Sequence, residues 1–489
     1  MGNAKYIINQ TVATIAVTTG IFGLGTVLAW SSPALPDMVN EKNGYFYNIS
    51  IEQQSWVGSV ATLGALASAP VAGFTVERMG RKGTMVLFSF PFILGWLVVG
   101  FATNVIMMCI GRFITGFCGG VFSLSAPLYI GESVSSNIRG MLMNSFQLML
   151  VTGILFTYVV GTYVPWKTLT LISAAIPVVF LFFVPFIPES PRYLRKKGQV
   201  EKADNALSWL FGPLSAEKPN SEPCDKDENE SKVSYKDLLK PDVIKPLAVA
   251  LTLMVLEQAS AFNVVIFYCV DIFAQTGTGL DSYWSSIIVA IVQVLATVFG
   301  TFLVDRAGRR VLLIWSEFIM GISFVALGIF FYLKKINDDH IPSGIGWLPL
   351  VSVLVFIIAF SIGIGPLSWT IMGEILHPDV KGLCSGIATS FVWFSAFVVT
   401  KIYQTLVAAV GIHWSFWIFS SVSLLGTVIV YLYVPETKGK TLEEIQQVFA
   451  QSSKGKRLSI VMPVQGFPVN VSNTEDNSIQ NRNCTVNGV

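Results

Sequence analysis

The stretch GFTVERMGRK at residues 73–82 and the related stretch GTFLVDRAGRR at residues 300–310 decide the fold. Each follows a long apolar run and places an acid and an arginine before a short turn that ends in two cations. A pattern that recurs after equivalent segments indicates two related halves. Because the turn is too short and too charged to lie in lipid, we expect each copy to join two spanning helices at one membrane face.

The composition is typical of a membrane protein. Hydrophobic residues make up 53% and charged residues 13% of the 489 residues, and the mean hydropathy is +0.62, so the chain lacks the charged surface that a soluble protein needs. A helix of about 20 apolar residues spans a bilayer core. Runs of that length predict twelve helices, at residues 11–30, 55–76, 85–103, 105–128, 141–163, 166–187, 246–270, 284–304, 311–332, 347–372, 383–409 and 412–434.

These runs predict an all-α membrane protein with twelve transmembrane helices in two pseudo-symmetric six-helix bundles and a cytoplasmic helical linker. The expected divisions are an amino-terminal bundle at residues 1–187, a linker with short helices at 188–245, a carboxy-terminal bundle at 246–434 and a cytoplasmic tail at 435–489. Lysine and arginine concentrate in the doubled turn and the linker, which places both termini in the cytoplasm. Gly363, Gly365 and Pro366 are expected to break the tenth helix.

Several classes of function are excluded. The formal net charge of +2 indicates no nucleic-acid partner, and the three histidines are too scattered for a catalytic site. The six cysteines have no paired spacing, so we expect no metal site and no cofactor, and without a nucleophile near a base the chain is not expected to be an enzyme. Asn48 begins a sequon in the first outer loop and is a predicted glycosylation site. The expected location is the plasma membrane, where the protein functions as a monomer in the lipid bilayer.

Further motifs recur in a fixed order. They are Gly111-Arg112-Phe113, Tyr129-Ile130-Gly131-Glu132 before Arg139-Gly140, and PESPR at 188–192, with partial copies at Gly373-Glu374 before Lys381-Gly382 and in PETKG at 435–439. With the doubled turn, this chain resembles the sugar transporters of the major facilitator superfamily over nearly its whole length. It is most similar to the insect facilitated trehalose transporters and the related facilitative glucose transporters.

The charges around the doubled turn predict a cytoplasmic latch. Acids and cations at the inner ends of helices from opposite halves can pair when the cytoplasmic side is closed and separate when it opens. The alternative is that the cations only set the topology, but topology does not require matching acids. The latch is predicted to contain Glu77, Arg78, Arg81, Lys82, Glu132, Arg139, Glu189, Arg192, Asp305, Arg306, Arg309, Arg310, Glu374, Lys381 and Glu436. Glu317, two turns after Arg310, is expected to join it, and Arg112 is expected to brace the two halves.

A substrate site is predicted near the membrane midplane, where polar side chains are costly unless they line a path. Amides suit hydroxyl groups because they both donate and accept, and indole faces suit the C–H side of a sugar ring. By resemblance, six residues match sugar-contacting positions of the family, and Tyr268 matches its outer gate. The six are Gln147, Gln258, Asn263, Gln293, Trp369 and Trp393. The alternative is that the amides bond between helices and the tryptophans anchor an interface.

Glu257 departs from the family pattern, which usually has a second glutamine beside Gln258. A carboxyl there either titrates during transport or donates a hydrogen bond as an acid. Proton-coupled members of the family that it resembles generally carry an acid in the first helix, whereas this chain has no carboxylate between Ile7 and Pro36. The resemblance therefore implies facilitated diffusion of a hexose or trehalose by alternating access. The alternatives are a proton-coupled sugar or polyol symporter and a non-transporting sugar sensor.

Overall fold

The computed structural model describes residues 2–40, 46, 49–212, 241–277, 279–338, 340, 344–376, 380–438 and 444. The predicted glycosylation site at Asn48, most of the predicted tail and residues 213–240 of the linker lie outside these residues. In the described part, the first half comprises α1 (Gly2–Ala29), α2 (Ser31–Asn40), α3 (Ile51–Met79), α4 (Arg81–Gly100), α5 (Val105–Ser133), α6 (Ser136–Tyr163), α7 (Trp166–Phe183) and the 3₁₀ turn η1 (Val184–Phe186).

Two short helices follow on the inner side, α8 (Pro191–Lys196) and α9 (Val200–Phe211). The second half then comprises α11 (Pro241–Ala259), α12 (Phe262–Phe267), α13 (Cys269–Thr276), α14 (Ser282–Ala307), α15 (Arg309–Ile336), α16 (Leu348–Ile362), α17 (Ile364–Ile375), α18 (Lys381–Val410) and α19 (Ile412–Tyr433). Twelve segments of the described residues are long and apolar enough to cross a membrane, which confirms the predicted number.

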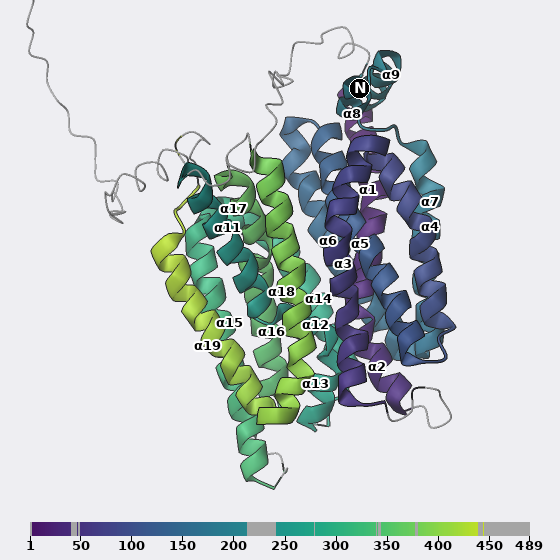
Figure 1. Cartoon of the computed structure of the whole chain (residues 1–489). Helices are drawn as coiled ribbons and strands as arrows, with labels where there is room; N and C mark the ends of the chain where they lie inside the picture. The colour runs from purple at the N-terminus through teal and green to yellow at the C-terminus, as the bar shows by residue number, and fades with distance from the viewer. Residues whose placement is uncertain are drawn as a thin grey trace, which may run out of the picture.

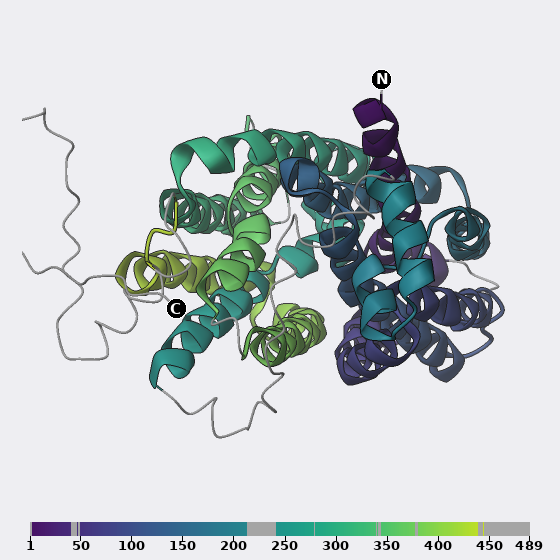
Figure 2. The same cartoon turned by 90° about the horizontal axis from the view of Figure 1, so that it is seen from above.

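The helices form two bundles that stand side by side (Figure 1). The halves meet where α3 contacts α18 and where α6 contacts α14. Helices α8 and α9 lie at the same end of the molecule as the amino terminus (Figure 1), and the view from above in Figure 2 shows this teal segment over the first half. This arrangement matches the predicted fold class of an all-α protein built from two related bundles.

The doubled turn has the same geometry in both halves. A single glycine separates the two helices in each copy, Gly80 between α3 and α4 and Gly308 between α14 and α15, with φ values of 88° and 93°. A side chain at such a positive φ clashes with the backbone, so glycine is the residue that allows so sharp a turn. The repeat therefore encodes one structural device used twice, as the sequence predicted.

Two spans are interrupted in the second half. Ala261 has a φ of 64° between α11 and α12, which is unusual for a residue with a side chain and marks a strained break. Helix α16 ends at Gly363, as predicted for the tenth span, and Ser316 of α15 holds this break. The Ser316 hydroxyl donates to the Ala359 carbonyl at 2.9 Å and accepts from the Ile364 amide at 3.1 Å. Broken helices expose backbone polar groups and are the usual place for a binding site in such folds.

Candidate functional site: a polar cluster at the break of the seventh span

The break after α11 brings three of the predicted binding residues together. Asn263 Nδ2 donates to Gln258 Oε1 at 2.5 Å, and Gln258 Nε2 donates to Glu257 Oε1 at 3.3 Å. All three side chains are buried. Glu257 also lies beside Ser368 and Trp369 of α17. The cluster therefore links the broken seventh span to the broken tenth span through polar groups.

The other predicted binding residues lie on separate helices. Gln147 is half-buried on α6, and Gln293 is fully buried on α14, which contacts α6 between the halves. Neither amide atom of Gln293 has a hydrogen-bond partner among the described residues. A buried polar atom without a partner is costly. Because both amide atoms are unpaired, Gln293 can still donate to and accept from a hydroxylated ligand.

The two tryptophans differ in their surroundings. Trp393 of α18 has 8% of its surface exposed, whereas Trp369 of α17 has 38%. Trp369 is adjacent to Glu257 and so belongs to the cluster, while Trp393 packs in the hydrophobic core of buried residues. An indole face that is partly open beside polar groups suits a sugar ring, because it offers apolar contact next to hydrogen-bond donors and acceptors.

Contacts between the two halves close the outer side. Tyr268, the predicted gate, is fully buried, and its hydroxyl lies against Gly58 of α3 in the first half. Within its own half its ring is tilted beside Tyr403 at 5.2 Å between ring centroids, and its hydroxyl donates to the Thr400 carbonyl at 3.4 Å. The Tyr158 hydroxyl of α6 donates to the Ile266 carbonyl at 2.6 Å, and Ser31 donates to the Phe267 carbonyl at 3.2 Å. These bonds join the outer parts of the first, fifth and seventh spans, so the described conformation is closed on that side.

On the inner side, the charges of the first half form a compact cluster. Arg81 is buried and bonds to Glu132 at 2.7 Å, and Ser190 donates a very short hydrogen bond to the same carboxylate. Glu189 accepts from the backbone amides of Arg81, Lys82 and Gly83, each at 3.1 Å. These amides are the unpaired groups at the start of α4, so Glu189 caps that helix and meets the positive end of its dipole.

Tyr193 of α8 completes this cluster. Its hydroxyl donates to the Arg78 carbonyl at 2.8 Å, and its ring lies under the Arg81 guanidinium at 5.5 Å. Burial and, after it, the Glu189 carboxylate raise the pKa of Tyr193, so the phenol keeps the proton that it donates. The sequence reasoning missed Ser190 and Tyr193. A serine before a proline is a helix start signal, and Ser190 is indeed the N-cap of α8, where it accepts from the Tyr193 amide.

The second half repeats the arrangement. Glu436 accepts from the backbone amides of Arg309 at 3.0 Å and Arg310 at 3.1 Å, at the start of α15. Arg309 pairs with Glu374 at 3.6 Å, as Arg81 pairs with Glu132 in the first half. In both of these pairs the two partners belong to the same half, whereas the predicted latch requires pairs between halves when the inner side is closed.

The remaining latch candidates take several roles. Glu77 bonds to Lys196 at 3.1 Å, Arg78 lies over the Phe74 ring, and Lys82 donates to the Ile187 carbonyl at 2.7 Å. Arg139 donates to the Val134 carbonyl, Arg310 to the Tyr431 carbonyl, and Lys438 to the Arg306 carbonyl, while Arg192 belongs to α8. The side chains of Asp305 and Lys381 lie outside the described residues.

The expectation for Arg112 was wrong in detail. Its guanidinium is fully buried and donates to the carbonyls of Val27 at 2.8 Å and Val57 at 3.4 Å, and it lies over the Trp30 ring at 5.0 Å. All three partners belong to the first half. Arg112 therefore braces α1, α3 and α5 within one bundle, because the carbonyls that it reaches are those of its neighbours there.

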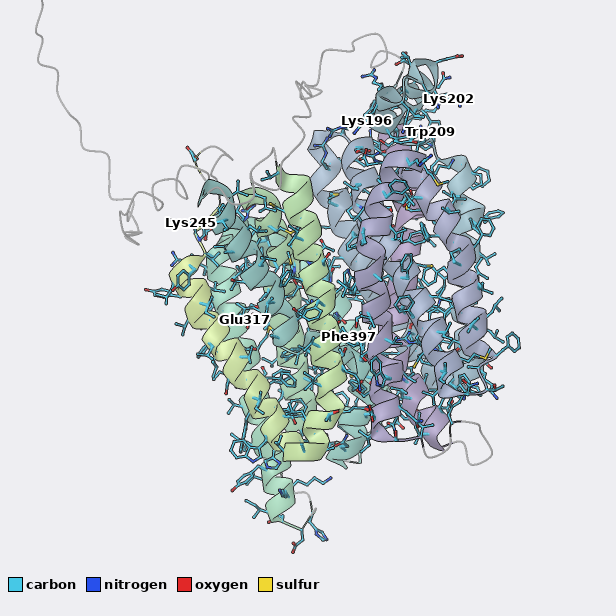
Figure 3. The ribbon with its side chains drawn as sticks, viewed as in Figure 1. Lys196, Lys202, Trp209, Lys245, Glu317 and Phe397 are labelled. Carbon is cyan, nitrogen blue, oxygen red and sulfur yellow. The ribbon has the colours of Figure 1, made fainter. Side chains whose placement is uncertain are left out.

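The expectation for Glu317 was also wrong. It does not join the inner cluster but lies deep between α15 and α19, with 0% of its surface exposed (Figure 3). In the described part of the chain neither carboxyl oxygen has a hydrogen-bond partner, although Ser423 faces it. The ionisable group that interacts with it electrostatically is another acid, Glu257. Two turns along α15 carry the side chain away from the membrane surface and into the bundle.

We expect Glu317→Leu to stabilise the protein. A buried polar group without a partner costs about 1–3 kcal/mol, and leucine fills a similar volume without that cost. The apparent melting temperature of the detergent-solubilised protein should rise, while Glu317→Gln, which keeps a buried polar group, should gain less. A lower melting temperature for the leucine variant would show that Glu317 has a favourable partner.

Comparisons with known proteins agree with this fold. A family model described as "Sugar (and other) transporter" matches residues 12–449. The facilitated trehalose transporter of Polypedilum vanderplanki is 39% identical over 474 residues, which are 96% of this chain and 93% of that protein. The facilitated trehalose transporter of Drosophila pseudoobscura pseudoobscura is 40% identical over 96% of this chain but only 54% of its own length, so the chain spans about half of that relative.

Solved structures give the same fold. An inward-open structure of the xylose transporter XylE from E. coli superposes with a TM-score of 0.74 and 22% identity, over 89% of this chain and 98% of that one. The proton:xylose symporter XylE bound to 6-bromo-6-deoxy-D-glucose also has a TM-score of 0.74, with 24% identity over 91% of this chain and 100% of the other.

Proposed function

Because the chain belongs to the sugar (and other) transporter family, we propose that it carries trehalose or a hexose across a membrane by facilitated diffusion with alternating access. The observation that carries the proposal is the buried hydrogen-bonded chain of Glu257, Gln258 and Asn263 at the break of the seventh span. Its relatives are named as facilitated trehalose transporters, which supports the substrate class. The protein acts as a carrier and not as an enzyme.

The binding site in this proposal consists of that chain together with Gln147, Gln293, Trp369 and Trp393. Glu257 offers an acceptor for a sugar hydroxyl, Gln258 and Asn263 offer both donors and acceptors, and Trp369 offers a ring face. Gln293 supports the proposal because its amide is buried and unpaired among the described residues. Tyr268 acts as the outer gate. Its buried ring belongs to the second half, and its hydroxyl lies where α3 of the first half meets α18.

The latch is proposed to work in two arrangements. With the outer side closed, Arg81 and Arg309 bond to acids of their own halves. We propose that closing the inner side brings the two charge clusters together, so that some of these groups exchange partners across the halves. In this proposal both termini and the linker lie in the cytoplasm, and the protein functions as a monomer in the plasma membrane, with the sugar path between its two halves.

Facilitated diffusion is favoured over proton symport by the partners of Arg112. Its guanidinium donates to backbone carbonyls of α1 and α3, and the first span supplies no carboxylate between Ile7 and Pro36 that could release a proton beside it. The symport alternative depends on Glu257, which lies buried within the proposed site.

A substrate panel in reconstituted vesicles tests both the carrier and the role of Glu257. Labelled trehalose and glucose should enter wild-type vesicles at rates that do not change with an imposed proton gradient. Glu257→Gln keeps the size of the side chain and one acceptor oxygen but replaces the other oxygen by an amide donor, so it should shift the preference among sugars and leave the response to the gradient unchanged. Uptake that requires an inward proton gradient, and that loses this requirement in Glu257→Gln, would replace facilitated diffusion by symport.

A further inference from the structure

A charged residue joins the two halves at the outer end of the molecule. Lys401 lies in the outer part of α18, and its ammonium nitrogen is 4.7 Å from the centroid of the Trp56 ring on α3. Trp56 also contacts Phe397, one turn earlier on α18, at 6.0 Å between centroids. Figure 3 shows Phe397 where α18 passes the first half. The tryptophan of one half is therefore held between an ammonium and a phenyl ring of the other.

The backbone at this position is fixed as well. The hydroxyl of Ser55, the neighbour of Trp56, donates to the Lys401 carbonyl at 2.6 Å. The two residues of α3 thus contact both the side chain and the backbone of Lys401. The hydroxyl bond does not depend on the lysine side chain and survives its replacement, whereas the cation–π contact does not. The two contributions can therefore be separated by experiment.

A lysine within a spanning helix requires compensation. The side chain of Lys401 is half-buried, and the negative face of an indole is the best aromatic partner for a cation. When the outer side opens, α3 and α18 must separate at this end, and the ammonium loses the indole. The contact is therefore present in the outer-closed state and absent in the outer-open state, which is the condition for it to shift the balance between them.

We propose that Lys401, Trp56 and Phe397 form an outer clamp whose strength sets how often the transporter opens to the outside. The proposal rests on alternating access as the mode of transport. It deepens that function by naming a contact that holds the outer side closed, in addition to the gate at Tyr268. A cation–π contact that is partly exposed is worth about 0.5–1 kcal/mol, which corresponds to a two- to fivefold change in the population of the open state.

The clamp can be tested without measuring sugar transport. Ser32 of α2 is fully buried against the second half, where its hydroxyl accepts from the Val270 amide at 3.1 Å. Because opening of the outer side would separate these two segments, we expect Ser32 to become accessible in the outer-open state. In a variant whose six native cysteines are replaced, Ser32→Cys reports opening through its rate of labelling by a membrane-impermeant maleimide. Lys401→Met removes the cation and keeps a long side chain, so labelling should become two- to fivefold faster.

The matched controls separate the clamp from charge alone. Lys401→Arg keeps a cation over the indole and should label at the wild-type rate. Lys334→Met removes another outer lysine, one that donates to the Gln275 carbonyl of its own half at 2.8 Å, and it should also leave the rate unchanged. Equal labelling of Lys401→Met and the wild type would overturn the proposal.

A second variant covers the case in which Lys401→Met does not fold. Trp56→Phe keeps an aromatic ring with a weaker attraction for cations, so it should label faster than the wild type but by less than the two- to fivefold expected for the loss of the whole contact. A wild-type rate in Trp56→Phe would overturn the clamp. Labelling is measured without substrate, so a failure of the clamp is distinct from a failure of sugar transport.

Discussion

Replacing Glu189 by alanine is expected to cause a large loss of stability, of about 3 kcal/mol or more. The carboxylate accepts from three consecutive amides at the start of α4 and from the amide of Ser190 at 2.8 Å. A hydrogen bond to a charged group contributes about 1.5–3 kcal/mol, and the amides of a first helical turn have no partner in their own helix. Alanine leaves these donors unsatisfied beneath the buried Arg81.

The measurement is the melting temperature of the solubilised protein, followed by size-exclusion chromatography after heating. Glu189→Gln keeps one oxygen acceptor and should have an intermediate value. Glu52→Ala removes an exposed acid from the first turn of α3 and is the matched control, with an expected change of less than 1 kcal/mol. If Glu189→Ala melts with the control, the carboxylate does not stabilise the turn.

Gln258→Ala is expected to weaken sugar binding by a factor of ten or more. Gln258 lies between Glu257 and Asn263 in the hydrogen-bonded cluster, so its removal deletes the contacts that we propose it makes with the sugar. It also releases Asn263, whose amide nitrogen donates to it. Loss of one or two hydrogen bonds to a ligand costs about 1–3 kcal/mol, and a tenfold change in affinity corresponds to 1.4 kcal/mol.

The affinity of Gln258→Ala can be measured by the quenching of tryptophan fluorescence or by competition with a labelled sugar. Gln54→Ala is the matched control, because Gln54 of α3 bonds to the Ile49 carbonyl at the outer end of the first bundle. An affinity for Gln258→Ala within twofold of the wild type would show that the hydrogen-bonded cluster of Glu257, Gln258 and Asn263 is not part of the sugar site.

The fold was predictable from the sequence because its signals are local. Apolar length gives each span, and a glycine with flanking charges gives the turn at Gly80 and again at Gly308. The break at Gly363 was predictable from small residues and a proline. The break at Ala261 was less visible, because an alanine does not ordinarily take a positive φ, and tertiary contacts must hold it there.

The site was less predictable because side-chain direction and conformational state are not local properties. The spacing of Glu317 from Arg310 suggested the inner surface, but the helix carries it into the contact with α19. In our proposal, the pairing of Arg81 with Glu132 inside one half depends on which side of the transporter is closed. The same sequence encodes every conformation, so it does not show which pairs form in each one. Lys401 and Trp56 are 345 positions apart, and nothing in either segment points to the other.

Counterflow in proteoliposomes tests the central claim most directly. Vesicles loaded with unlabelled trehalose or glucose are diluted into a small amount of labelled sugar, with no ATP and no ion gradient. The account predicts a transient accumulation of label above its equilibrium level, because the excess of unlabelled sugar inside competes with the labelled sugar for exit through the same carrier. Sugar binding without any counterflow, for both sugars, would contradict it.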